Sequence, residues 1–189
     1  MTIVVGIGAS AGGVTAIAAV LASLPKDFPA AILVVQHQDP HGHSFLAPVL
    51  ARECRLPVRK AVAGETITAG TVYVAPPGIH LAVRDGQVAL SEAAPVHYSR
   101  PSVDVLFRSI ADACGPRAVA VILTGAGQDG AAGLRAIKAA GGRTIVQDPV
   151  DAEYAGMPTA AHATGCADMT LPLHDIGPAL MTLVCEATT

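Results

Sequence analysis

Short apolar segments alternate with segments of helical character along most of this chain of 189 residues. The apolar segments cover residues 2–7, 31–36, 72–75, 119–123 and 143–146. Helices are predicted over residues 14–24, 44–52, 102–114 and 131–140, and a turn and a helix close the chain over residues 171–186. Buried strands that alternate with helices form parallel sheets with helices on both faces. The sequence therefore predicts an α/β fold with a doubly wound, mostly parallel sheet.

Composition supports this fold class. Hydrophobic residues make up 51% of the chain and aromatic residues only 3%, so the core must consist of Ala, Val, Ile and Leu, as in parallel strands covered by helices. The length suits one compact domain, which we expect to span residues 1–189. Between residues 58 and 90 the alternation changes, because residues 81–83 and 87–90 flank the turn signal Asp85-Gly86. This pattern predicts a β-hairpin near the edge of the sheet.

Charge and cysteine usage exclude several classes of function. The net charge of −3 comes from 12 basic and 15 acidic residues without a basic run, so no nucleic-acid partner is expected. The 4 cysteines include no CxxC pair, so no metal site is predicted. Residues 1–25 carry no charge, but glycines interrupt them and no basic segment precedes them. We therefore expect a cytoplasmic protein without membrane insertion.

Three predicted strands end in side chains that could share one reaction. Ser10 lies in the glycine-rich turn after the first strand, His37 directly follows the second, and Asp129 lies in the glycine-rich turn after strand 119–123. Ligands of open parallel sheets bind beyond the carboxyl ends of the strands, where these three residues are expected to meet. A serine nucleophile needs a base to accept its proton and an acid to orient that base. The pattern predicts a Ser-His-Asp site.

Each residue also has a structural interpretation. Ser10 could cap the helix that begins near residue 14, and Asp129 could cap the helix that begins at residue 131. His37 could be a hydrogen-bonded histidine at a strand end. Only the joint placement of the three residues favours catalysis.

A dinucleotide site is the main competing interpretation of the first turn. Residues 6–11 satisfy the pattern G-x-G-x-x-G/A after a strand and before a helix. The acidic residue that would bind the ribose should end the second strand, but Gln36 and His37 stand there and Asp39 lies beyond it. An oxidoreductase thus remains a weaker alternative, and no cofactor is predicted.

Five longer motifs favour one of these functions over the others. Their positions are 8–13 (Gly-Ala-Ser-Ala-Gly-Gly), 35–37 (Val-Gln-His), 100–107 (Arg-Pro-Ser-Val-Asp-Val-Leu-Phe), 123–131 (Leu-Thr-Gly-Ala-Gly-Gln-Asp-Gly-Ala) and 156–158 (Gly-Met-Pro). Together they resemble the catalytic domain of the CheB-type chemotaxis protein-glutamate methylesterases. The resemblance implies a serine hydrolase that removes methyl groups from glutamate methyl esters on chemoreceptors, with deamidation of receptor glutamines as a related activity. It assigns Ser10 as nucleophile, His37 as base and Asp129 as the third member.

The chain departs from the family pattern at residues near the predicted Ser-His-Asp site. Ala11 stands where the family often has Thr, and Ala126, Gly127 and Gln128 stand where it often has Met-x-Asn. Backbone N–H groups of these residues are candidates to bind the oxyanion. Two residues of the third motif are further candidates to line the site. These are Arg100, which could equally be a surface charge, and Ser102, which could equally be an N-cap.

The family's receiver domain, which usually precedes the catalytic domain, has no counterpart before the strand at residues 2–7. We therefore expect a site that is open to a macromolecular substrate, with control by expression, by location or by a partner chain. The expected partner is a methyl-accepting chemotaxis receptor or a related methylated protein. A catalytically weak relative that only binds a receptor or another partner remains a second alternative.

Overall fold

The computed structural model describes residues 2–39 and 45–186. A sheet of 7 strands in the order β3-β4-β2-β1-β7-β8-β9 forms its centre, and each neighbouring pair is parallel. The strands of this sheet are β1 (Ile3–Ala9), β2 (Ala30–Gln36), β3 (Val58–Lys60), β4 (Val72–Val74), β7 (Ala118–Ile122), β8 (Arg143–Gln147) and β9 (Met169–Leu171). The predicted α/β fold with a parallel sheet is confirmed.

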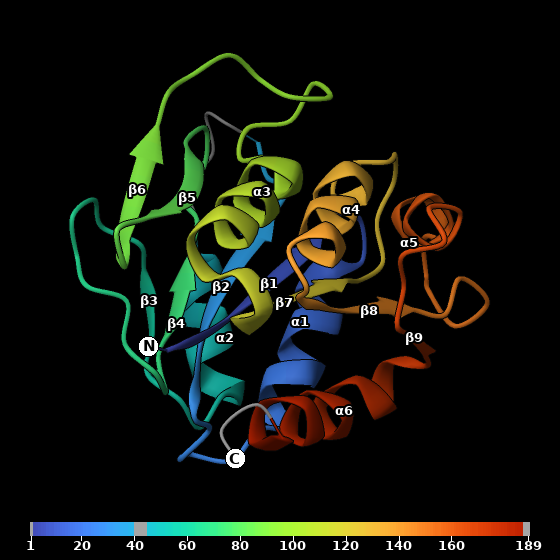
Figure 1. The fold of residues 1–189 in the computed structure, drawn as a ribbon, viewed down its shortest axis with the longest axis horizontal. Helices are drawn as coiled ribbons and strands as arrows, with labels where there is room; N and C mark the ends of the chain where they lie inside the picture. Colours follow the sequence, from blue (N-terminus) through green and yellow to red (C-terminus); the bar gives the residue numbers. More distant parts are fainter. Residues whose placement is uncertain (1, 40–44, 187–189) are drawn as a thin grey trace.

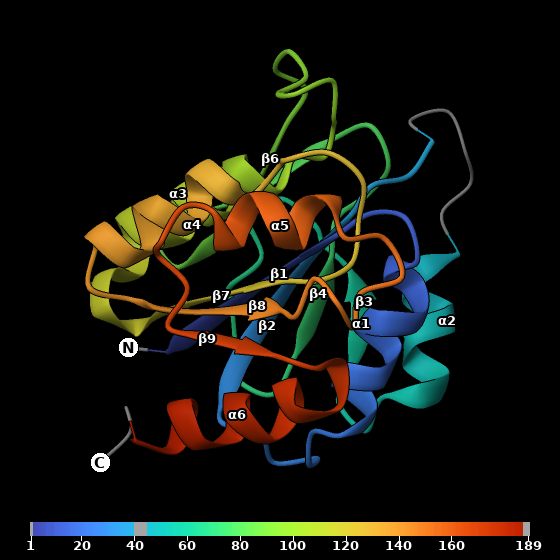
Figure 2. The same ribbon diagram turned by 90° about the vertical axis from the view of Figure 1, so that its right-hand side faces the viewer.

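Helices cover both faces of the sheet (Figures 1 and 2). The helices α1 (Gly13–Ala22), α2 (Leu46–Glu53) and α6 (Leu173–Glu186) pack on one face. The helices α3 (Val103–Cys114), α4 (Ala131–Ala139) and α5 (Gly156–His162) pack on the other. A short 3-10 helix, Gly115–Arg117, follows α3. The first residue of the predicted helix 44–52 lies outside the described residues.

Successive residues of β1 point to opposite faces of the sheet, and the two faces differ in the size of these residues. Ile3, Val5 and Ile7 point into the core beneath α1 and α6. On the opposite face Gly6 and Gly8 leave room for α3, because a Cβ on Gly8 would lie 2.3 Å from Cγ1 of Val103. The two glycines thus bring the N-terminus of α3 against the carboxyl end of β1, which is the predicted location of the site.

The predicted hairpin is present, with strands β5 (His80–Arg84) and β6 (Gln87–Ser91) in a sheet of their own. It packs against α3. Sequence analysis did not predict β3, β9 or α5. The two strands have 3 residues each and lie at the edges of the sheet, where pairing with a neighbour, and not a long apolar run, defines a strand. In the described part of the chain, no helix is both long enough and apolar enough to cross a membrane.

Candidate active site

Ser10 lies in the tight turn between β1 and α1. Its N–H donates to the carbonyl of Thr124 at 3.0 Å, and its own carbonyl accepts from Gly13 N–H at 2.9 Å. The N-cap of α1 is Gly12, with φ of 73° and no side-chain cap. The interpretation of Ser10 as a helix cap is therefore wrong. The Ser10 hydroxyl makes no hydrogen bond within residues 2–39 and 45–186, so it is free to react.

The turn after β7 packs directly on the Ser10 turn. A Cβ on Gly125 would lie 2.8 Å from Cβ of Ser10 and 2.4 Å from Sδ of Met157. The buried hydroxyl of Thr124 donates to the carbonyl of Ala11 at 3.1 Å and accepts from Tyr154 N–H at 2.8 Å. Only glycine at residue 125 allows the two strand ends to approach this closely.

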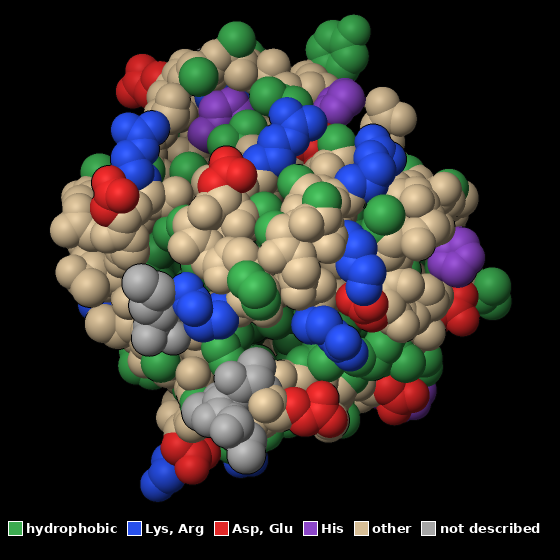
Figure 3. Space-filling model, viewed as in Figure 1, with side chains coloured by type: hydrophobic (Ala, Val, Ile, Leu, Met, Phe, Trp, Pro, Cys, Tyr) green, Lys and Arg blue, Asp and Glu red, His purple; other side chains and the backbone are tan. Residues whose placement is uncertain are grey.

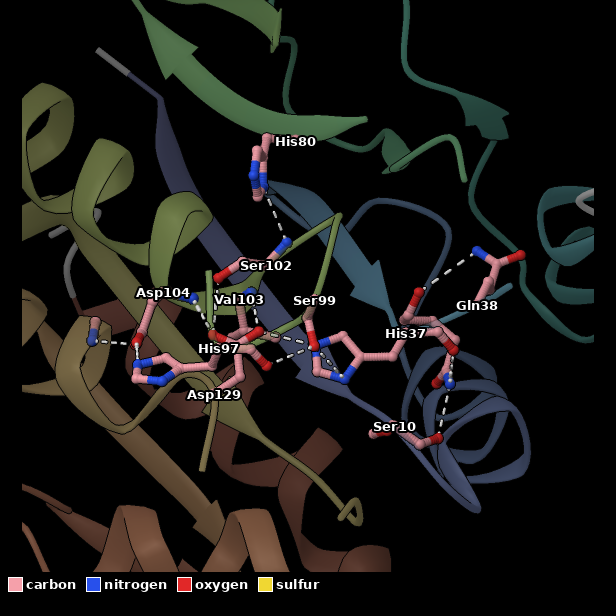
Figure 4. A network of polar contacts seen from close by, with 12 residues as sticks. Ser10, His37, Gln38, His80, His97, Ser99, Ser102, Val103, Asp104 and Asp129 are labelled. Carbon is pink, nitrogen blue, oxygen red and sulfur yellow. Dashed lines mark hydrogen bonds and ion pairs between the residues drawn. The ribbon is translucent and has the colours of Figure 1, made fainter. Parts of the chain in front are cut away.

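His37 contacts Asp129 across the end of the sheet. Its Nε2 lies 2.8 Å from Oδ2 of Asp129, and Figure 4 shows the imidazole between Asp129 and Ser10. An ionised carboxylate only accepts hydrogen bonds, so Nε2 carries the proton and Nδ1 is the ring's acceptor. The Ser99 hydroxyl lies 3.5 Å from Nδ1, at the limit of a hydrogen bond.

Asp129 is buried at the N-terminus of α3. Besides His37 it accepts hydrogen bonds from the Ser102 hydroxyl at 2.8 Å, from Val103 N–H at 2.7 Å and from Asp104 N–H at 3.0 Å. It does not cap the helix that follows it, because the N-cap of α4 is Gly130 without a side-chain hydrogen bond. The alternative interpretation of Asp129 as the cap of α4 is therefore wrong. Asp129 binds instead at the N-terminus of α3, where helix dipole and free N–H groups favour an anion.

These hydrogen bonds determine the charge of Asp129. Burial raises the pKa of its carboxyl group, but the hydrogen bonds from His37 and from the first turn of α3 outweigh this effect. The pKa of Asp129 therefore lies below its ordinary value. At neutral pH the residue is therefore a buried anion that accepts a hydrogen bond from His37.

The Gln36 side chain makes hydrogen bonds to the backbones of both Ser10 and His37. Its Nε2 donates to the carbonyl of Ser10 at 2.7 Å and to the carbonyl of His37 at 3.0 Å. Its Oε1 is buried without a hydrogen-bond partner among the described residues, and it lies 2.0 Å from where a Cβ on Gly13 would be. The sequence assigned Gln36 no role of its own, although this residue stands in one of the motifs of the family resemblance. The motif Val-Gln-His was the signal that could have identified it.

Around His37 the site opens to the surface in several adjoining depressions, of which two concern the predicted residues. One, of about 470 Å³, is lined by Ser10, Gln36, His37 and residues 11–15. The other, of about 250 Å³, is lined by His37, Gln38, Pro95 and residues 98–101. His37 borders both depressions, so a substrate on this face can reach the imidazole and the Ser10 turn together.

The remaining predicted residues lie near Ser10, His37 and Asp129 but make different contacts. Arg100 lines the smaller depression, and its Nη1 donates to the carbonyls of Glu92 and Ala93 at 2.7 and 3.1 Å. Ser102 occupies the N-cap position of α3, but its hydroxyl binds Asp129 and caps no helix. The N–H groups of Ala11 and of residues 126–128 make no hydrogen bond within the described parts of the chain, so both predicted sources of an oxyanion donor persist.

Two further histidines support the site and were not predicted. His80 is buried, accepts from Ser102 N–H at 3.2 Å through Nδ1 and contacts the carbonyl of Ala94 at 3.1 Å through Nε2. His97 contacts the buried carboxylate of Asp104 at 3.3 Å. Among residues 2–39 and 45–186, no three His, Cys, Asp or Glu side chains are grouped so that they could hold a metal ion.

Fold and site together define an α/β protein in which serine, histidine and aspartate come from three strand ends of one parallel sheet. The model of the CheB methylesterase family matches residues 5–180. The chain belongs to this family, and the resemblance recognised from its motifs is confirmed.

Individual relatives agree with this assignment. The protein-glutamate methylesterase/protein-glutamine glutaminase 2 of Anaeromyxobacter dehalogenans is 50% identical over 180 residues, which cover 95% of this chain and 53% of the relative. The protein-glutamate methylesterase/protein-glutamine glutaminase of Moorella thermoacetica is 45% identical over 189 residues, which cover 97% of this chain and 45% of the relative. The chain thus spans about half the length of the curated relatives it matches.

A solved structure matches the whole fold. The crystal structure of the Thermotoga maritima CheB methylesterase catalytic domain has a TM-score of 0.92 and 36% sequence identity, covering 97% of this chain and 100% of that chain. The predicted fold class is confirmed by this match.

Proposed function

We propose that this chain is a serine hydrolase that cleaves glutamate methyl esters on a methyl-accepting chemotaxis receptor or a related methylated protein. The observation that carries the proposal is the His37–Asp129 hydrogen bond of 2.8 Å, which leaves Nδ1 as the proton acceptor of a ring that lines the same depression as Ser10. Family membership and the names of the relatives support the same activity. The lowered pKa of Asp129 supports its role as an anion that orients the imidazole.

The proposed reaction has two halves. Ser10 Oγ attacks the ester carbonyl, and its proton passes to Nδ1 of His37. The C–O bond to the methoxy group then breaks, and Nδ1–H protonates the leaving group to give methanol. In the second half His37 accepts a proton from water, whose oxygen attacks the acyl-enzyme. The bond between the acyl carbon and Ser10 Oγ then breaks, His37 returns the proton to Oγ, and the free glutamate carboxylate leaves.

Two sets of groups would support these steps. The N–H of Ala11 and an N–H from residues 126–128 would bind the oxyanion, and the loss of one such donor typically costs about 10²–10³ in rate. Asp129 would stabilise the imidazolium that forms when His37 accepts the proton. The same steps, with ammonia as the leaving group, would deamidate a receptor glutamine, as the names of the relatives suggest.

Methanol release from a methylated receptor fragment tests the proposal. Wild type is expected to release methanol, and Ser10→Ala is expected to lose this activity while it keeps its far-UV spectrum and melting temperature. Thr182→Ala, which removes a hydroxyl on α6, serves as the matched control and should stay fully active. Methanol release by Ser10→Ala at the wild-type rate would refute the proposed nucleophile. A folded wild type that releases none would favour a module that only binds its partner.

A further inference from the structure

The connection between β6 and α3 carries a turn with an unusual backbone. Val96 and Ser99 pair through two hydrogen bonds, N–H to carbonyl, of 3.1 and 2.9 Å. The two residues between them, His97 and Tyr98, have φ of 48° and 62°. Turns with two central residues of positive φ strongly favour Asn and Gly, because other side chains are strained there. Histidine tolerates positive φ better than most residues, but the bulky Tyr98 occupies this turn against its local preference.

Contacts on both sides hold the connection in place. His80 contacts the carbonyl of Ala94, and Arg100 donates to the carbonyls of Glu92 and Ala93. Within the turn, Nε2 of His97 lies 3.3 Å from Oδ2 of Asp104, which is fully buried in the first turn of α3. This is a close polar contact and not a well-aligned hydrogen bond, because Oδ2 has no hydrogen-bond partner among the described residues. The strained turn is thus anchored to the same helix end that binds Asp129.

The anchored turn brings two side chains to the active site. Ser99 reaches the free nitrogen of His37, as Figure 4 shows, and Tyr98 lines the depression that His37 borders. The Tyr98 side chain is nevertheless fully exposed, at 103% of its reference area. Figures 1 and 2 show this connection extending beyond the ends of the helices, and hydrophobic and histidine side chains lie at the surface of that region in Figure 3.

We propose that the turn Val96–Ser99 is the substrate-recognition element of the site, and that Tyr98 determines specificity by contacting the protein that carries the ester. An isolated exposed tyrosine needs no explanation, but here a strained backbone and buried contacts hold it beside the catalytic imidazole. Strain of this kind persists where function requires it. Tyrosine is among the residues that contribute most to binding at protein interfaces, because its ring covers a large area at low entropic cost.

The inference rests on the proposed esterase function. Two substrates distinguish a failure of recognition by Tyr98 from a failure of that function. A methylated receptor fragment can reach Tyr98, whereas p-nitrophenyl acetate is small enough to react at Ser10 without reaching the turn. Tyr98→Ala is expected to lower the ratio of kcat/KM for receptor to kcat/KM for the small ester by about 10-fold or more, mainly through KM. Tyr98→Phe keeps the ring and is expected to stay within about 3-fold of wild type. Val62→Ala, at an exposed valine away from the site, is the control and should leave the ratio unchanged.

Tyr98→Gly distinguishes recognition from a structural role. Glycine accepts positive φ without strain, so its melting temperature should equal or exceed that of wild type while the ratio falls as in Tyr98→Ala. A ratio within about 2-fold of wild type in both Tyr98→Ala and Tyr98→Gly would overturn the inference, and so would an equal loss in Tyr98→Phe. If wild type hydrolyses neither substrate, the proposed function itself fails.

Discussion

The two halves of the candidate site are held in different ways. Asp129 is buried and accepts four hydrogen bonds, three of them from the first residues of α3 and the residue before it. Ser10 is fixed only through its backbone, and its hydroxyl makes no hydrogen bond within the described residues. In the proposed reaction Asp129 must keep its charge and its position, and its carboxylate is held by hydrogen bonds. Ser10 must give up its proton and bond to the acyl carbon, and its hydroxyl is left available.

Asp129→Asn should have the largest effect, because it changes the bound half of the site. One carboxylate oxygen becomes an NH₂ group that must face a donor, either His37 or the N-terminus of α3. If the amide donates to Nε2, the ring proton moves to Nδ1, which then cannot accept the proton of Ser10. We expect kcat to fall by about 10⁴, as for the corresponding change in a serine protease.

Steady-state methanol release measures this effect, and urea unfolding shows whether the fold persists. Ser10→Ala is the matched comparison, because it should lose activity without losing stability. If Asp129→Asn loses stability but keeps its turnover per folded molecule, Asp129 is only a structural cap of α3.

Gly125→Ala is expected to disturb the open half of the site. The new Cβ would lie 2.4 Å from Sδ of Met157 and 2.8 Å from Cβ of Ser10, so the Ser10 turn must shift. Misplacement of a reacting group by about 1 Å can cost about 10² in rate, and overpacking typically costs about 1–3 kcal/mol of stability.

Gly165→Ala provides the control for this change. Residue 165 has φ of 67° and open space around a new Cβ, so this variant should lose stability through backbone strain but keep its turnover number. Labelling of Ser10 by a fluorophosphonate measures the reactivity of the nucleophile in both variants. Equal labelling rates would contradict the packing argument.

Ser102→Ala removes one of the four hydrogen bonds to Asp129. The other three remain, so we expect a loss of about 1–2 kcal/mol in the free energy of unfolding and a decrease of about 10-fold in kcat. Ser109→Ala in α3 is the control, because it also removes a hydroxyl that makes hydrogen bonds. The Ser109 hydroxyl accepts from Val83 N–H and donates to the Leu106 carbonyl. This variant should lose similar stability without the loss of kcat, and equal kcat values in the two variants would show that Ser102 has no part in the site.

The smallest expected effect is the pH dependence of stability that Asp129 contributes. Its pKa is lower in the folded protein than in the unfolded chain, so its contribution is fully present above the unfolded pKa of about 3.9. The contribution is lost as the pH falls from there through the folded pKa. The difference in unfolding free energy between wild type and Asp129→Asn should therefore be constant from pH 6 to about 5 and decrease toward pH 3. A difference that grows on acidification would contradict the lowered pKa.

The sequence alone determined the inner strands of the sheet and the strand ends that carry the candidate site. Apolar runs such as residues 31–36 report burial on both faces, and the carboxyl ends of parallel strands necessarily meet at one edge of a sheet. For this reason Ser10, His37 and Asp129 could be predicted together from one chain. The sequence placed Gly8 in a motif, but it did not predict that Gly6 and Gly8 leave the space into which α3 packs.

Tertiary structure alone decided how the three residues are held. Asp129 is 25 to 27 residues from its partners at the start of α3, and His37 is 62 residues from Ser99. Such contacts depend on the distance and angle at which separate elements pack, which local periodicity does not report. The strained turn at residues 96–99 has the same origin, because its sequence disfavours positive φ and contacts with His80, Asp104 and residues 92–93 hold it there. Local sequence preference therefore predicts the elements, and the packing between them determines the geometry of the site.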